Sequence, residues 1–224
     1  MVTSGLRLAG AMAILYAARR FYRNWGTTKQ ECGMYLVGDE TGYGPGVQST
    51  EAVSIDAPAG TVWPWLVQMG QDRGGLYTYE KFENLVGLRY VNADRVHPEW
   101  QHLAPGDTVR FVPLGWMGLR DGIVFEVVEV ADQQSIVLRA FTGRKWNVVW
   151  SFHLVPRGRD RCRLLIRVRT KLRQPGQALV TELVEPARAL MTRGMLLGIK
   201  RRAQQQFQAE ASAARASEDL HRVV

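Results

Sequence analysis

The sequence is poor in the residues that cross-link small proteins or bind metals. It has two cysteines in 224 residues, Cys32 and Cys162, which could form one disulfide but not a disulfide framework. Neither has a partner cysteine or histidine at zinc-site spacing, and His97 and His102 are too far apart to share a helical metal face. We therefore expect free thiols in a reducing compartment, no metal site and no cofactor.

Standard catalytic motifs are also missing. The chain has no HExxH, no phosphate-binding P-loop, no GxSxG elbow and no dinucleotide-binding glycine pattern. The glycine pair after Arg73 is typical of a loop, because no helix N-terminus with free amides follows it. Catalytic residues therefore cannot be assigned from motifs.

The N-terminal apolar segment, residues 5–18, is shorter than the about 20 residues that span a bilayer. Its dense positive charge, Arg19, Arg20 and Arg23, follows the apolar run, which is the reverse of a secretory signal. Two interpretations of residues 1–24 remain. They form a helix packed on the domain or on a second subunit, or an interfacial anchor on an anionic membrane surface.

The overall composition is that of a globular chain. Hydrophobic residues make up 46% and charged residues 22%, and the length fits one domain with extra segments at its ends. The net charge of +8 favours anionic partners without choosing among them.

Alternating apolar residues predict a β-rich middle. The expected strands are residues 47–57, 108–112, 120–130, 135–141, 145–155 and 161–172, and the short turns between the last four allow only antiparallel connections. In the last strand Leu164, Ile166 and Val168 share one face, whereas Arg167 and Arg169 lie on the other. This parity predicts a sheet with one buried and one solvated face.

The basic face of the last strand has three interpretations. A solvated surface is favoured, contact with an anionic membrane is second, and nucleic acid is disfavoured because no aromatic residues interleave with the charges.

Short helices are expected after the first strand, over residues 59–69 and 79–86, and a long helix is expected after residue 176, with a restart at Pro186. The order predicts an α+β fold, a curved antiparallel sheet wrapped on a long C-terminal helix. We assign residues 25–46 to a connecting segment, 47–207 to the domain, and 208–224 to a frayed helical or disordered tail.

The sequence resembles the helix-grip fold of the START-like superfamily, also called SRPBCC, which includes polyketide cyclases and dehydrases and lipid-transfer domains, and within it an actinobacterial branch. The resemblance covers roughly residues 24 to 205 and is most specific over 55–95. It is carried by residues 25–28 (WGTT), 37–40 (VGDE), 55–58 (IDAP), 62–70 (VWPWLVQMG), 73–79 (RGGLYTY), 83–88 (ENLVGL), 92–95 (NADR), 185–186 (EP) and 195–202 (MLLGIKRR).

A helix-grip fold implies an apolar cavity between sheet and helix, with residues 68–97 around its mouth. Arginines there could bind a carboxylate or phosphate head, and tyrosines a ligand carbonyl. The indoles on the inward face are core packing or a cavity wall. The candidate ligand-binding residues are Trp65, Gln68, Met69, Arg73, Tyr77, Tyr79, Asp94, Arg95, His97, Trp146, Trp150 and Met191.

These observations lead to a hypothesis with two rivals. The chain binds a hydrophobic small molecule or lipid, in the cytoplasm or peripherally at the inner face of the plasma membrane. One rival is a cyclase, aromatase or dehydratase acting on a polyketide-like ligand, with proton transfer by residues such as Tyr77, Tyr79, Asp94 or His97. The other is an interaction protein whose cavity is filled by side chains. The ligand and the oligomeric state do not follow from the sequence.

Overall fold

The alternating segments pair into one sheet in the computed structural model, which describes residues 10, 19, 22–42, 44, 46–142, 146–172 and 175–222. The strands are β1 (Gly46–Ile55), β2 (Thr108–Val112), β3 (Ile123–Ala131), β4 (Ser135–Thr142), β5 (Trp146–Pro156) and β6 (Cys162–Lys171). Their spatial order is β1-β6-β5-β4-β3-β2, and every neighbouring pair is antiparallel. The predicted antiparallel sheet is therefore confirmed.

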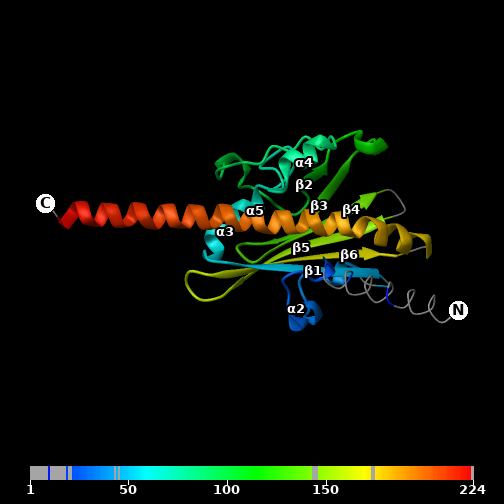
Figure 1. The fold of residues 1–224 in the computed structure, drawn as a ribbon, viewed down its shortest axis with the longest axis horizontal. Coiled ribbons are helices and arrows are strands. Elements are labelled where there is room, and N and C mark those ends of the chain that lie inside the picture. Colours follow the sequence, from blue (N-terminus) through cyan, green and yellow to red (C-terminus); the bar gives the residue numbers. More distant parts are fainter. Residues whose placement is uncertain are drawn as a thin grey trace.

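Two register shifts bend this sheet. One falls between Arg110 and Val112 of β2, and the other between Val127 and Glu129 of β3. An extra residue on one strand increases the local twist and bends the strand. The sheet is accordingly curved, as predicted, and its strands fan out beneath the C-terminal helix in Figure 1.

One long helix, α5 (Pro175–Arg222), crosses the apolar face of the sheet (Figure 1). Met195, Leu196 and Ile199 recur at helical spacing and are fully buried, where α5 packs against β1 and against α3 (Ala59–Val67). The curved sheet wrapped on a long C-terminal helix is the predicted helix-grip arrangement.

The course of α5 differs from the prediction at one place. The helix is continuous through Pro186, where the sequence predicts a restart. A proline removes one N–H donor, and the turns on either side keep their own hydrogen bonds. Residues 208–222, where the sequence predicts a frayed helical end or disorder, continue α5 as a helix that extends past the sheet (Figure 1).

The segment between α3 and β2 covers the part of the apolar face near β2. It carries α4 (Glu80–Leu85) and the short helix η2 (Pro98–Trp100). The Gln71 N–H donates to the Arg110 carbonyl over 2.8 Å, and the Tyr90 hydroxyl donates to the Phe111 carbonyl. These bonds hold residues 68–97 against the edge strand β2.

The opposite face of the sheet is partly buried, which corrects the expectation of a solvated face. The connecting segment forms α2 (Lys29–Gly33) and η1 (Glu40–Gly42) over it, so the side chain of Arg167 is 1% exposed. Arg167 pairs with Asp39 at 2.7 Å and donates to the Glu31 carbonyl at 2.8 Å. Parity identifies the side on which Arg167 lies, but it cannot show that a distant segment covers that side.

The same cover buries His153 of β5. Burial, helped by the nearby Arg167 guanidinium, lowers the pKa of His153 to about 4. This imidazole is therefore neutral at physiological pH.

A buried charge network joins β1 to α5. Glu51 is 1% exposed and accepts from Arg188 over 3.0 Å, while Arg188 also donates to Glu185 over 2.7 Å and to Thr192 over 3.1 Å. One carboxylate oxygen of Glu51, Oε2, has no hydrogen-bond partner. Burial raises the pKa of Glu51 to about 8, against the opposing effect of Arg188.

Two glycines of α5 allow close contact with residues 77–79. A Cβ added to Gly198 would lie 1.9 Å from the Tyr77 carbonyl oxygen, whereas one added to Gly194 would meet the ring of Tyr79 at 2.8 Å. The short distance at Gly198 shows that this glycine lets α5 pack closely on the backbone of residue 77. The obstacle at Gly198 is backbone, and the obstacle at Gly194 is the end of a partly exposed side chain.

We expect Gly198→Ala to lower the free energy of unfolding by about 1–3 kcal/mol, because the backbone of residue 77 cannot move without disturbing the core. Gly194→Ala is the matched control. It should change the free energy by less than about 1 kcal/mol, since the gain in helix propensity offsets a shift of the Tyr79 ring. Urea denaturation of both variants measures the difference, and equal effects would contradict the close-packing role of Gly198.

The raised pKa of Glu51 predicts a pH-dependent stability. Between about pH 4.5 and about pH 8 this carboxyl is ionised in the unfolded chain but protonated in the folded protein. Its contribution to stability is therefore complete below that range and is lost as the pH rises through it. Glu51→Gln cannot ionise, so it should gain stability relative to the wild type as the pH rises.

Thermal denaturation across this pH range measures the effect. Glu129→Gln, at an exposed position of β3, controls for the loss of a surface charge. A stability difference between Glu51→Gln and the wild type that does not change with pH would contradict the prediction.

Candidate functional site

The candidate site begins at the end of α3, where the chain makes a tight loop. The N–H of Gly70 donates to the Gly75 carbonyl over 3.0 Å, and the N–H of Gly75 donates back over 2.8 Å. Both glycines have positive φ, 140° and 76°, which most residues with side chains avoid. The loop returns the chain into the core at Leu76 and Tyr77.

Tyr77 has an unusual backbone conformation for a bulky residue. Its φ is 59°, in the left-handed region, and its N–H donates to Asn92 Oδ1 over 2.6 Å. Such a conformation costs about 1–3 kcal/mol and persists only where the surroundings enforce it. Here Asn92 and the close approach of Gly198 enforce it.

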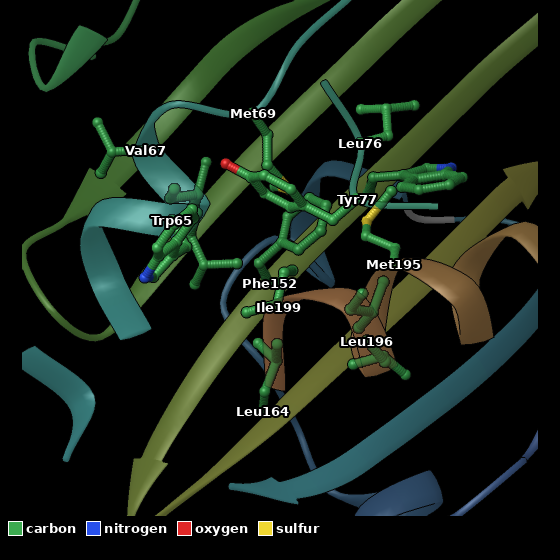
Figure 2. Packing of buried hydrophobic residues seen from close by; sticks show 14 of the residues in the cluster. Trp65, Val67, Met69, Leu76, Tyr77, Phe152, Leu164, Met195, Leu196 and Ile199 are labelled. Carbon is green, nitrogen blue, oxygen red and sulfur yellow. The ribbon is translucent and has the colours of Figure 1, made fainter. Parts of the chain in front are cut away.

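The ring of Tyr77 is buried between α3 and α5, and its residue is 2% exposed. Trp65 meets it edge-on at 5.8 Å between ring centroids, and the Arg202 guanidinium lies 4.8 Å above the ring centroid. Figure 2 shows the ring reaching toward Met69, with Met195 and Ile199 of α5 close by. The surroundings of the phenol are therefore mainly apolar.

The hydroxyl of Tyr77 is buried, and the Gln68 side chain lies close enough to interact with it, but no group meets it at a normal hydrogen-bond distance and angle. Burial raises the pKa of this phenol well above its usual value, although Gln68, Arg202 and Arg73 lie close enough to oppose the rise. A buried hydroxyl without a partner costs about 1–3 kcal/mol, so its presence calls for an explanation.

Two arginines flank the phenol. Arg73 is half-buried and donates to the Trp100 carbonyl, and Arg202 donates from Nε to the Ala93 carbonyl over 2.7 Å. Burial lowers the pKa of both guanidinium groups. Each keeps further N–H donors near the phenol, so the site combines an apolar interior with three polar groups.

Gln68 is fully buried and joins this site to the following loop. Its Nε2 donates to the Arg95 carbonyl over 3.1 Å, and its Oε1 accepts from the His97 N–H over 2.9 Å and from Gln101 over 3.3 Å. The side chain therefore holds the loop and also lies beside the Tyr77 hydroxyl.

The structure brings together five of the candidate residues: Trp65, Gln68, Met69, Arg73 and Tyr77. It does not bring the other loop residues to the same point. Asp94 and Arg95 are exposed, and Tyr79 is 43% exposed beside Gly194. His97 pairs with Glu99 at 3.1 Å and stacks on Trp100 at 4.3 Å between ring centroids.

The remaining candidates lie elsewhere in the core. Trp150 belongs to an aromatic cluster with Phe111, Phe125 and Phe152, and Met191 is half-buried on α5. The side chain of Trp146 lies outside the described residues.

Sequence reasoning missed Asn92 as a candidate, and it missed Arg202 as a neighbour of Tyr77. Arg202 comes from the far end of the chain, and no local pattern connects it with residue 77. Sequence reasoning also missed the burial of Glu51. Strand parity gives a signal for it, because Glu51 lies on the same face of its strand as Val53 and Ile55.

Three hollows in the described part of the molecule lie at its surface. One of about 170 Å³ lies between Trp25 and α5, one of about 230 Å³ lies beside Arg167 on the outer sheet face, and one of about 340 Å³ lies along α5 after Leu197. None of these three reaches Tyr77, so the enclosed cavity stays a prediction. Among the described residues, no three His, Cys, Asp or Glu side chains group closely enough to bind a metal ion.

Neither known family models nor curated proteins match the chain. Solved structures do match it. The Zhui aromatase/cyclase from a Streptomyces species is 13% identical, with 72% of this chain and 96% of that chain covered and a TM-score of 0.47. Norcoclaurine synthase from Thalictrum flavum is 15% identical, with 80% and 94% covered and a TM-score of 0.42. A START superfamily protein from Mycobacterium smegmatis is 17% identical, with 67% and 98% covered and a TM-score of 0.35.

Identities and TM-scores this low carry no conclusion about activity or ligand. The fold is established by the order of the strands and by the helix that they wrap. On this topology, a curved antiparallel sheet closed by short helices and a long C-terminal helix, the chain has a helix-grip fold.

Proposed function

We propose that the chain binds a hydrophobic small molecule or lipid between the sheet and α5, with the Tyr77 hydroxyl as its polar anchor. The observation that carries this proposal is the buried phenol without a partner, held in a strained backbone conformation. Backbone strain and an unpaired buried polar group both lower the stability of the folded protein. Such features cluster at functional sites, where a ligand can pair with the polar group.

The chemistry of the site indicates the kind of ligand. The raised pKa keeps the Tyr77 phenol protonated, so it can donate to a carbonyl, ester or hydroxyl oxygen. Arg73 and Arg202 would complement a carboxylate or phosphate at one end of the ligand. The aliphatic and aromatic surroundings would take the apolar part.

A ligand needs room beside the phenol, and two methionines can provide it. Met69 and Met195 are both buried next to Tyr77 in Figure 2. Methionine side chains are unbranched and change rotamer more easily than branched ones, so they adapt to a guest at low cost. We infer that binding displaces these side chains and leaves the backbone contact at Gly198 in place.

Binding is favoured over the catalytic alternative. A cyclase or dehydratase needs at least two proton-transfer groups at one ligand position. Of the four groups considered, Tyr77 alone lies in this interior, while Asp94 is exposed and His97 pairs with Glu99. A phenol whose pKa is raised is also a poor base near neutral pH.

We predict that Tyr77→Phe makes the ligand-free protein more stable and weakens ligand binding. Removing an unpaired buried hydroxyl should raise the free energy of unfolding by about 1 kcal/mol. Tyr90→Phe is the matched control, because its hydroxyl is buried but donates to the Phe111 carbonyl. That variant should lose about 1 kcal/mol, since a buried carbonyl is left unpaired.

Ligand binding is measured with a fluorescent fatty acid analogue and by native mass spectrometry of the full chain purified from lipid-containing cells. The wild type and Tyr90→Phe should bind alike, and Tyr77→Phe should bind about five- to tenfold more weakly, the effect of one hydrogen bond. Equal affinity for all three proteins would remove the anchor role of Tyr77. A wild type that carries no ligand and does not bind the probe would overturn the proposed function.

A further inference from the structure

Two neighbouring segments expose large apolar side chains beside β2. One is the end of α4 with the turn that follows it, and the other is the β2–β3 connection with the short helix η3 (Trp116–Gly118). The indole of Trp116 donates to the Val86 carbonyl over 2.8 Å, which joins the segments, and Figure 1 places α4 beside β2 and β3. We name the exposed apolar residues of both segments the apolar tip: Leu85, Val86, Leu114, Met117 and Leu119.

The exposure of this tip is large for residues of its kind. Leu85 is 82% exposed, Met117 is 81% exposed and Leu114 is 65% exposed. Scattered single exposed leucines are ordinary, but a contiguous apolar group on a water-soluble surface marks a contact site.

The backbone holds these side chains in tight turns. Met117 and the nearby Arg89 have positive φ, 47° and 53°, and they are two of the four non-glycine residues with positive φ in the described part of the chain. Left-handed residues other than glycine gather at functional sites, where the surroundings keep the strain. The presence of two such residues at this tip therefore supports a role beyond connecting two strands.

The tip is bordered by cations without partners. Lys81, Arg89 and Arg120 are exposed and, within the described residues, form no ion pair. Exposed acids also lie in this region: Asp121 follows Arg120, and Asp72 pairs with Arg110, whose guanidinium donates to the Asp121 carbonyl over 3.0 Å. Exposed apolar side chains flanked by unpaired lysine and arginine match the acyl boundary and the phosphate layer of an anionic bilayer.

We propose that the apolar tip docks on a lipid bilayer that contains anionic lipid. The apolar side chains enter the acyl boundary, while Arg89, Arg120 and Lys81 contact lipid phosphates. A protein partner fits less well, because the protruding residues are aliphatic and Trp116, the aromatic anchor that protein interfaces favour, is tied to Val86. Residues 5–18, which apart from Gly10 lie outside the described residues, play no part in this inference, and the inference does not depend on the proposed function.

The test is co-flotation of the full chain with vesicles of phosphatidylcholine alone or mixed with phosphatidylglycerol. Leu85→Asn with Met117→Asn removes apolar contact, and asparagine tolerates the left-handed backbone at 117. This double variant should lose at least about tenfold in partitioning to the mixed vesicles. The matched control is Leu183→Asn with Val184→Asn, which removes two exposed apolar side chains of α5.

A second pair of variants tests the charges. Arg89→Asn with Arg120→Asn should weaken partitioning by about fivefold per arginine at low salt, and the loss should shrink as salt rises. Arg157→Asn with Arg159→Asn removes the same charge from the exposed β5–β6 turn and should have little effect. A purely general attraction by net charge would instead weaken both pairs equally, which would contradict the proposal.

A further readout does not rely on substituting the apolar residues. When the protein binds vesicles that contain brominated lipid, the bromine should quench the emission of Trp116. This quenching should be absent in the Trp116→Phe variant. The proposal is supported if both double variants of the tip bind the mixed vesicles more weakly than their matched controls and if brominated lipid quenches the emission of Trp116. The proposal is overturned if the wild type does not bind the mixed vesicles or if the tip variants and their controls bind them equally. It is also overturned if the wild type self-associates through the tip and the tip variants abolish that self-association.

Discussion

The contact between Gly198 and the backbone of Tyr77 sets the geometry on which the rest of the interior depends. No side chain larger than hydrogen fits at residue 198, so α5 lies directly on the loop that leaves α3. This approach buries the Tyr77 ring under Arg202 and leaves its hydroxyl buried without a hydrogen-bond partner. The strained φ of Tyr77, the bond from Asn92 and the position of α5 are therefore one coupled arrangement.

The sheet is buried on both sides by different chemistry. On the α5 side, apolar residues such as Ile166 and Phe152 form the core, and Glu51 with Arg188 is the polar exception. On the other side, α2 and η1 cover Arg167 with carbonyls and the Asp39 carboxylate. The connecting segment is thus a structural layer, because it both buries the Arg167 guanidinium and supplies most of its hydrogen-bond partners.

Local pattern predicted the strands and the covering helix, since alternation and helical spacing are properties of neighbouring residues. Long-range events were not predictable from it. Parity placed Arg167 on the outer face but could not show that residues 26–42 return to cover it. Similarly, residues 68–97 were predicted to surround a cavity mouth, and five candidates from residues 65–77 do converge. Asp94 and His97 diverge because Gln68 fixes their loop by its backbone groups.

The buried carboxyl of Glu51 makes folding a protonation reaction as well as a packing reaction. At neutral pH the unfolded chain carries this group as an anion, and closing α5 over β1 takes a proton from solution. That proton comes from the buffer, so the heat of folding includes the buffer's own ionisation enthalpy. Calorimetry in phosphate and in an amine buffer would then report different enthalpies for the same structural change.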